Sequence, residues 1–443
     1  MNRWVVVLGA VLIQLCLGSV YAWSVFTGPL KVAIVNGGYG FSNSQTQLVF
    51  SAGLVSWAVM VAVGGWLQAR IGPRRTALLS GVILGAGYIL GGLVGKTFWA
   101  QFICIGVVGG AGIGLGYVVP IAVGVKWFPD KKGLITGLAV AGFGFGATLW
   151  VKLAGGFKAF LWLGGGYAGL LQTLHLFGLS GVQSVFFVYG LVYFGLIIVG
   201  AQVMINPPAG YAPKGWTPAM ASGQTGTVEY TRREMVRSPQ YYILSSIFTC
   251  SGIAGVMVIG SIALFGADKL VASGYATADE AKLITGTAAA LLSVFNGLGR
   301  IAWGGVSDRI GRRMALFLMC CIQGSTLFAF FNIGGTALGL TVGACIVGFN
   351  YGGNFALFPA ATADLFGNKN VGTNYGWVFF FYGLAGLAGP LIAGRLTDGA
   401  TAAAVGAWRL PFMIAGTTCL VGAVLALVLR PMRRPVAALE PAE

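Results

Sequence analysis

The feature that most constrains this chain is a series of apolar stretches, each long enough to cross a lipid bilayer. A membrane-spanning helix needs about 20 mostly apolar residues. Twelve such stretches occur, at 4–28, 46–69, 76–94, 98–125, 134–155 and 183–205, and then at 241–266, 281–306, 314–333, 336–363, 373–393 and 408–429. Only 9% of the residues are charged, too few for the water-facing surface of a soluble domain. The sequence therefore predicts an all-α integral membrane protein with twelve transmembrane helices.

A polar segment divides these stretches into six and six. Residues 206–240 are rich in proline, glycine, serine and charge, which is typical of a linker. We therefore expect an N-terminal six-helix bundle at 1–205, a cytoplasmic linker at 206–240 and a C-terminal six-helix bundle at 241–443. Residues 157–182 are apolar but too few for two more spans, so we expect a re-entrant or surface helix there, on the outer face.

The basic residues indicate which ends of the helices face the cytoplasm. With the N-terminus inside, the cytoplasmic segments hold 18 Lys and Arg residues and the outer segments hold 8. This bias follows the positive-inside rule, so we expect both termini in the cytoplasm and the chain in a plasma or inner membrane. The net charge of +16 is spread over short clusters rather than one basic face, which argues against nucleic acid as a partner.

Side chains that bind metals or catalyse reactions are sparse. All seven cysteines fall inside apolar stretches, without the spacing of metal ligands or disulfide pairs. The one histidine, His175, lies in an outer connection, and no acid–base pair is evident within the spans. We therefore expect no cofactor, no metal and no enzymatic activity. A membrane enzyme and a transporter-like sensor without flux are the competing interpretations.

The two halves repeat each other at a constant offset of 239 residues. The matching pairs are Gly65 and Gly304, Arg70 and Arg309, Gly72 and Gly311, Pro120 and Pro359, Gly133 and Gly372, and Gly137 and Gly376. One shift across separate places indicates a duplicated six-helix unit. Parallel halves with a substrate site between them are the layout of a large class of secondary transporters.

Arg300 is a charged residue inside a predicted span. It lies two helical turns from Asp308, roughly 12 Å from the helix end at 1.5 Å per residue. An arginine near the bilayer centre costs at least about 2.5 kcal/mol on insertion scales, so it should face a cavity or a partner. The acidic residues all lie in loops, tails or helix ends, which disfavours a permanent ion pair. We therefore expect the planar guanidinium to bind the carboxylate of a substrate.

Other side chains are placed to complete a pocket. Ser293, Asn296 and Arg300 form a polar stripe at helical spacing. Hydroxyl and amide groups can bind a carboxylate and aromatic faces fit an aliphatic stem, although packing explains any one aromatic residue equally well. The expected substrate-binding residues are Arg300, Asn296, Tyr351, Tyr117, Tyr382, Phe355 and Phe379. The glycine runs at 112–116 and 142–146 lie within spans, so we expect them to allow close helix packing.

The run from Gly304 to Arg313 carries a family resemblance. Its G-x-x-x-D-R-x-G-R-R pattern resembles the signature loop of the major facilitator superfamily, at its second-half position. The first-half copy has Ala69 in place of the aspartate and Pro73 in place of an arginine, which weakens the gating charges expected there. The residues assigned to the signature and gating loops are Gly304, Asp308, Arg309, Gly311, Arg312, Arg70 and Arg74.

Three further segments narrow the resemblance. The segments at 126–133, 295–308 and 355–359 resemble the oxalate/formate antiporter branch, which is related to the proton-linked monocarboxylate (lactate) transporters. The resemblance covers nearly the whole chain. It implies transport of small carboxylates, which we expect to proceed by rocking of the two halves around Arg300.

Tyr382 indicates the charge of the substrate. In the resembling oxalate exchanger a lysine stands at the position of Tyr382, which gives two buried cations for a dianion. This chain keeps only Arg300, and one cation balances one carboxylate. We therefore expect a monocarboxylate such as lactate, pyruvate or formate, with an oxalate/formate-type anion exchanger as the alternative.

The residues indicate less directly whether transport is coupled to protons or to a second anion. Monocarboxylate carriers of the eukaryotic type have an aspartate four residues before the matching arginine, where this chain has Asn296. We expect proton-coupled symport in which the proton travels on the substrate or on a transient site, and the same charges equally allow exchange of two anions. The expected partners are a small carboxylate, protons and membrane lipid, and we expect a monomer.

Overall fold

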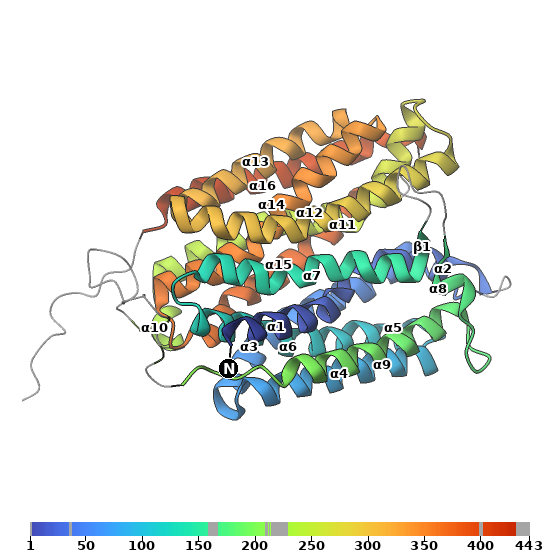
Figure 1. Ribbon diagram of the computed structural model, residues 1–443. Helices are drawn as coiled ribbons and strands as arrows, with labels where there is room; N and C mark the ends of the chain where they lie inside the picture. Colours follow the sequence, from blue (N-terminus) through green and yellow to red (C-terminus); the bar gives the residue numbers. More distant parts are fainter. Residues whose placement is uncertain are drawn as a thin grey trace, which may run out of the picture.

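The computed structural model describes residues 2–34, 38–157, 167–208, 211, 213, 229–397 and 402–430. These residues are almost entirely helical, and most of the helices run along one common direction (Figure 1). The strands in this part of the chain are β1 (Gly156–Phe157) and β2 (Tyr167–Ala168), which pair antiparallel. The prediction of an all-α protein is confirmed.

The helices follow the predicted order. Those of the first half are α1 (Arg3–Leu17), the 3-10 helix η1 (Gly18–Trp23), α2 (Ser24–Lys31), α3 (Asn43–Ile71), α4 (Pro73–Val94), α5 (Phe98–Gln101), the π-helix η3 (Phe102–Gly109), α6 (Gly110–Trp127), α7 (Lys132–Gly155), α8 (Leu170–Thr173) and α9 (Gly181–Ala201). Those that follow are α10 (Arg232–Met235), α11 (Pro239–Ala272), α12 (Ala278–Ile310), α13 (Arg312–Ile333), α14 (Ala337–Phe366), α15 (Val371–Thr397), the 3-10 helix η4 (Ala402–Trp408) and α16 (Arg409–Val428).

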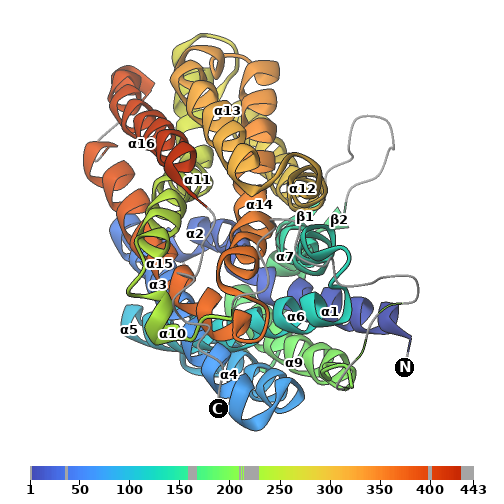
Figure 2. The same ribbon diagram turned by 90° about the vertical axis from the view of Figure 1, so that its left-hand side faces the viewer.

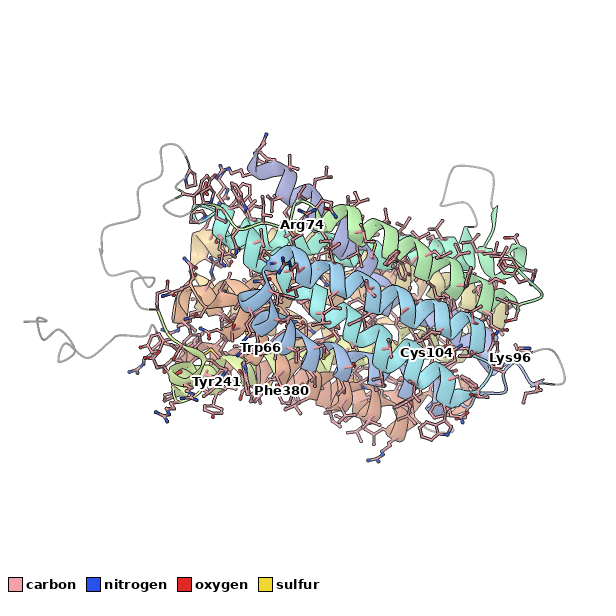
Figure 3. All side chains as sticks on the ribbon, turned by 90° about the horizontal axis from the view of Figure 1, so that it is seen from below. Trp66, Arg74, Lys96, Cys104, Tyr241 and Phe380 are labelled. Carbon is pink, nitrogen blue, oxygen red and sulfur yellow. The ribbon has the colours of Figure 1, made fainter. Side chains whose placement is uncertain are left out.

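The helices have the length and the surface of membrane spans. Eleven helical stretches among the described residues are long and apolar enough to cross a membrane. Helix α12 is also long enough, with 33 residues, but more polar, and it supplies the twelfth predicted span. Large apolar side chains project from the bundle, for example Trp66 and Phe380, each 44% exposed (Figure 3). An apolar outer surface of this kind suits lipid rather than water.

The first predicted span is interrupted rather than continuous. Between α1 and α2 the chain tightens into η1, all of whose residues are buried. A Cβ atom at Gly18 would collide with the backbone carbonyl of Phe143 in α7, so the chain approaches α7 closely where η1 begins. This segment carries Tyr21 into the space between the halves.

A re-entrant or surface helix is expected within 157–182, and the described residues there include one short helix. They form the β1–β2 pair and the one-turn helix α8, and residues 158–166 lie outside the described part. Phe177 and Gly178 then adopt positive φ values of 52° and 74°. That left-handed turn stops any helix from continuing into α9.

The internal repeat is visible in the backbone. Gly72 joins α3 to α4 with φ 86° and ψ 160°, and Gly311 joins α12 to α13 with φ 84° and ψ 154°. Glycine adopts such angles without steric cost. The two signature loops therefore have the same conformation, and we call the end of the bundle that carries them the signature end.

Helices α7 and α15 lie at the boundary between the halves. Helix α7 packs against α12 and α15 packs against α3, and Figures 1 and 2 show both helices between the two groups. The two halves therefore meet through α3 and α7 of the first half and α12 and α15 of the second. The domain boundaries at 205/206 and 240/241 stay a prediction.

Glycines allow these boundary helices to touch. A Cβ atom at Gly137 of α7 would collide with the backbone carbonyl of Arg300, and one at Gly144 would lie 2.7 Å from the backbone nitrogen of Gly297. Within the run at 112–116, a Cβ atom at Gly114 would lie 2.6 Å from the Met60 side chain. The prediction that the two glycine runs serve helix packing is confirmed.

Candidate substrate site

Arg300 lies where α7 and α12 meet, with 0% of its surface exposed. Its Nε donates a hydrogen bond to Oδ1 of Asn296 at 3.0 Å, and its Nη1 donates to the backbone carbonyl of Val140 at 2.9 Å. The guanidinium carbon also lies 4.3 Å from the ring centroid of Phe355 and 5.0 Å from that of Phe143. Neutral groups from both halves therefore hold the charge.

No carboxylate lies within ion-pair distance of Arg300 in the part of the chain that the structure describes. Three described acidic residues form ion pairs elsewhere, Asp130 with Arg3 and both Asp308 and Asp364 with Arg312. The Nη2 atom of Arg300 makes no hydrogen bond of good geometry with any described residue. Among the described residues the side chain is therefore buried without an opposite charge, an arrangement that an anionic ligand would complete.

Three tyrosines join the halves beside this arginine. The hydroxyl oxygen of Tyr21 lies 2.7 Å from that of Tyr351 and 3.0 Å from that of Tyr382, and the last two are 2.6 Å apart. In this closed ring each hydroxyl can donate one hydrogen bond and accept another. Because Tyr21 comes from η1 and its two partners from α14 and α15, the ring links the two halves at the centre of the bundle.

Trp57 of α3 lies in the middle of an aromatic cluster. Its ring stacks on Phe143 with centroids 4.9 Å apart and packs against Tyr117 and Phe379, each at 5.1 Å. The Trp57 Nε1 and Tyr117 hydroxyl make no hydrogen bond of good geometry among the described residues. The cluster therefore combines an apolar wall with polar atoms that can still bind a ligand.

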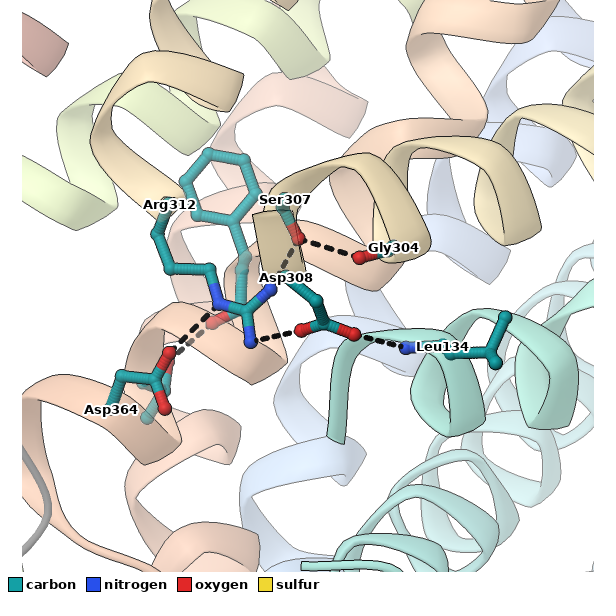
Figure 4. A network of polar contacts seen from close by, with 8 residues as sticks. Leu134, Gly304, Ser307, Asp308, Arg312 and Asp364 are labelled. Carbon is teal, nitrogen blue, oxygen red and sulfur yellow. Dashed lines mark hydrogen bonds and ion pairs between the residues drawn. The ribbon is translucent and has the colours of Figure 1, made fainter. Parts of the chain in front are cut away.

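The second-half signature loop connects the halves at the signature end (Figure 4). Arg312 lies 2.6 Å from Oδ1 of Asp308 and 2.8 Å from Oδ2 of Asp364, and it also donates to Ser307. The other carboxylate oxygen of Asp308 accepts the backbone N–H of Leu134 at 3.0 Å, in the first turn of α7. A helix N-terminus carries partial positive charge, so this contact is electrostatically favourable.

Comparison with known proteins identifies the fold family. The family model described as Major Facilitator Superfamily matches residues 12–390 and 271–443. The chain belongs to this superfamily. It is therefore a multi-pass membrane transporter and not an enzyme.

Three relatives resemble this MFS transporter over most of their length. An uncharacterised MFS-type transporter of Escherichia coli is 30% identical over 87% of this chain and 86% of its own. The oxalate:formate antiporter of Oxalobacter formigenes is 28% identical over 98% and 93%. The apicoplast pyruvate carrier 1 of Toxoplasma gondii is 25% identical over 85% and 81%.

The structure of the MFS transporter brings the expected substrate-binding residues together, and their role stays a prediction. All are buried in one central region; they are Arg300, Asn296, Tyr351, Tyr117, Tyr382, Phe355 and Phe379. Tyr21, Trp57, Phe143 and Tyr375 pack in the same region. No local sequence pattern singles them out, because nothing in an apolar span distinguishes an aromatic residue that faces the centre from one that faces lipid. The 239-residue offset, which pairs Phe143 with Tyr382, was the one available signal for Phe143.

The first-half signature loop of the MFS transporter makes neutral contacts with the other half. Where Asp308 would have its counterpart stands Ala69, and nearby Thr373 of α15 donates to the Gly65 carbonyl at 3.3 Å. Arg70 lies over the Trp66 ring at 4.2 Å and Arg74 donates to Gln202, both within the first half. The charged contact is therefore found at only one of the two copies among the described residues.

The remaining signature residues have local roles. The Gly304 carbonyl accepts a hydrogen bond from Ser307 at 2.8 Å, Gly311 forms the left-handed turn, and the Arg309 side chain is exposed. No cluster of three or more metal-binding side chains occurs among the described residues.

This conformation of the MFS transporter leaves little room at the site. A cavity of about 10 Å³ adjoins Asn296 and Tyr21, on the side of Arg300 away from the signature end. That is enough for roughly one water molecule. A molecule larger than water can therefore reach Arg300 only when the helices around it move apart.

Proposed function

We propose that this MFS transporter carries small monocarboxylates, such as lactate or pyruvate, by alternating access, with Arg300 binding the carboxylate. The observation that carries the proposal is a fully buried guanidinium whose partners among the described residues are all neutral. Arginine binds carboxylates through paired, charge-assisted hydrogen bonds. The Nη2 atom of Arg300 and the Nδ2 atom of Asn296 still have hydrogens to donate to such a ligand.

A single negative charge on the substrate suits this site. Tyr382 contributes a neutral hydroxyl close to Tyr21 and Tyr351. Val61, the first-half counterpart of Arg300 at the 239-residue offset, is apolar. A dicarboxylate would bring a second negative charge into a region of low dielectric with no second cation to balance it.

The relatives support the substrate class and leave a second candidate. One is named as a pyruvate carrier and another as an oxalate:formate antiporter. The 28% identity to the antiporter over 98% of the chain favours anion exchange as the alternative function. Both candidates share Arg300 as the carboxylate ligand.

Proton-coupled symport in a plasma or inner membrane completes the proposal. The excess of basic residues near the signature end supports placing that end and the termini in the cytoplasm. No carboxylate lies beside Arg300 in the described residues to carry a proton. The proton therefore travels on the substrate or on a transient site. We also propose that the transporter works as a monomer.

Competition for labelled lactate uptake into proteoliposomes tests the substrate. We expect formate and pyruvate to compete strongly, and oxalate and succinate to compete weakly. Strong inhibition by oxalate alone would overturn the choice of a monoanion. Binding of lactate without any flux would instead identify a sensor.

A pH jump tests the coupling. Proteoliposomes without internal substrate receive an inward proton gradient and external labelled lactate. We expect the gradient to drive accumulation. An absolute requirement for internal carboxylate would establish exchange instead.

A further inference from the structure

The contacts of Arg300 determine whether the carrier can reorient without a substrate, provided that Arg300 binds carboxylates as proposed. Moving between inward-open and outward-open forms requires the site to close. Closing it around a guanidinium that has no counter-charge and no acceptor is costly. A transporter without acceptor groups for the guanidinium would therefore reorient only with substrate bound. Such a transporter would be an obligatory exchanger.

Arg300 contacts several neutral groups of the protein itself. The Val140 carbonyl accepts from Nη1 at 2.9 Å and the Asn296 side chain accepts from Nε at 3.0 Å. The rings of Phe355 and Phe143 lie within 4.3 Å and 5.0 Å of the guanidinium carbon. Aromatic faces carry partial negative charge, and they attract a cation more strongly where water is excluded.

The contact with Val140 depends on closure of the two halves. Val140 lies on α7 between Gly137 and Gly144, which touch the backbone of α12 at Arg300 and Gly297. A carbonyl oxygen has two lone pairs, so Val140 can accept from Arg300 in addition to its own helix. Because the donor and acceptor belong to different halves, this hydrogen bond forms when α7 and α12 come together.

We propose that the Val140 carbonyl, Asn296, Phe143 and Phe355 act as an internal counter-ligand that lets the carrier reorient without a carboxylate. These groups take the place of the substrate at the guanidinium as the site closes. The transporter therefore catalyses net, one-way flux as well as exchange. The proposal assigns Phe143 as a positioning residue. Phe143 lies in the first half, whereas Arg300 lies in the second.

The test measures net uptake and exchange on the same protein. Labelled lactate enters proteoliposomes that contain either no carboxylate or saturating unlabelled lactate. Phe143 is replaced by phenylalanines with one, two and three fluorines, which weaken the cation–π attraction with little change in ring size. The same series at Phe265 serves as the matched control. Phe265 is a buried ring that packs on Phe412 at 4.6 Å and is not one of the rings at the Arg300 guanidinium.

We expect the ratio of net uptake to exchange to fall with each added fluorine at Phe143, by about fivefold over the series. The series at Phe265 should leave the ratio of the two rates unchanged. Exchange that stays measurable through the series also shows that the variants fold.

Three results would overturn the proposal. They are a wild-type protein that exchanges lactate but shows no net uptake, a fluorinated series with unchanged net uptake, and a series in which both rates fall together. A wild-type protein that neither takes up nor exchanges any monocarboxylate would overturn the proposed function itself, which is a different outcome.

Discussion

Asp308, near the end of α12, accepts a hydrogen bond at 3.0 Å from the backbone N–H of Leu134 in the first turn of α7. The same carboxylate pairs with Arg312 at 2.6 Å, so it connects the second-half signature loop to the first half. At the other copy Ala69 has no carboxylate to offer. The contacts between the halves at the signature end are therefore unequal at the two copies of the loop.

Removing the Asp308 carboxylate should favour opening at the signature end. A hydrogen bond to a charged group contributes about 1.5–3 kcal/mol, so we expect Asp308→Ala to raise the open population by at least about tenfold. Spin labels on the ends of α7 and α12 report the change as a longer distance. Ala69→Asp, which adds a carboxylate at the other copy, should shift the population the opposite way. An unaltered distance distribution in Asp308→Ala would show that this contact does not hold the gate.

Arg300→Lys should lose most transport. An ammonium cannot reproduce the two-pronged contact of a guanidinium with a carboxylate, so we expect lactate uptake to fall by at least about tenfold. The measurement is initial uptake into proteoliposomes at matched protein content. Arg409→Lys, the same change at an exposed position, serves as the control. Wild-type uptake in Arg300→Lys would remove Arg300 from the site.

A second cation at position 382 should change the preferred charge of the substrate. The Tyr382 hydroxyl lies 3.0 Å from that of Tyr21 and 2.6 Å from that of Tyr351, within the central region. We expect Tyr382→Lys to improve oxalate competition by about tenfold or more, because an ammonium can pair with the second carboxylate. Tyr382→Phe removes the hydroxyl but adds no charge, and it should leave oxalate a weak competitor. Equal oxalate affinity in both variants would refute the charge argument.

The glycine contact between α7 and α12 should tolerate no side chain. A Cβ atom at Gly137 would collide with the Arg300 carbonyl, whereas one at Gly286 of α12 meets nothing within 4 Å. Overpacking costs about 1–3 kcal/mol, so we expect Gly137→Ala to lower both the melting temperature and the transport rate. Gly286→Ala should be neutral or stabilising by up to about 1 kcal/mol, because alanine favours helix. Equal melting temperatures for the two variants would contradict this packing.

The sequence predicts the spans and the central arginine because both signals are local. Twenty apolar residues in a row require a helix in lipid, and a charge inside one is conspicuous. The first-half aromatic residues Tyr21, Trp57 and Phe143 were not predicted, because they have no such local signal. Their hydrophobicity resembles that of any lipid-facing residue, and only the packing of η1, α3 and α7 against the second half places them around Arg300.

Partners that are backbone atoms were equally beyond prediction. The motif identifies Asp308, but its partner is the N–H of Leu134, which any residue except proline would supply. The Val140 carbonyl that accepts from Arg300 likewise cannot be identified from the sequence, because every residue has a backbone carbonyl. The glycines around it do, since Gly137 and Gly144 mark where two helices approach without side chains between them.

The glycine contacts also relate Arg300 to an inconspicuous residue. Gly137 touches the backbone of Arg300, and its repeat counterpart Gly376 touches the backbone of Ala62 and Val61 in α3. The internal repeat therefore has two equivalent positions, Val61 and Arg300, and just one of them bears a charge. Under the proposed function, a point mutation at either position would change the charge offered to the cargo while the rest of the scaffold stayed the same.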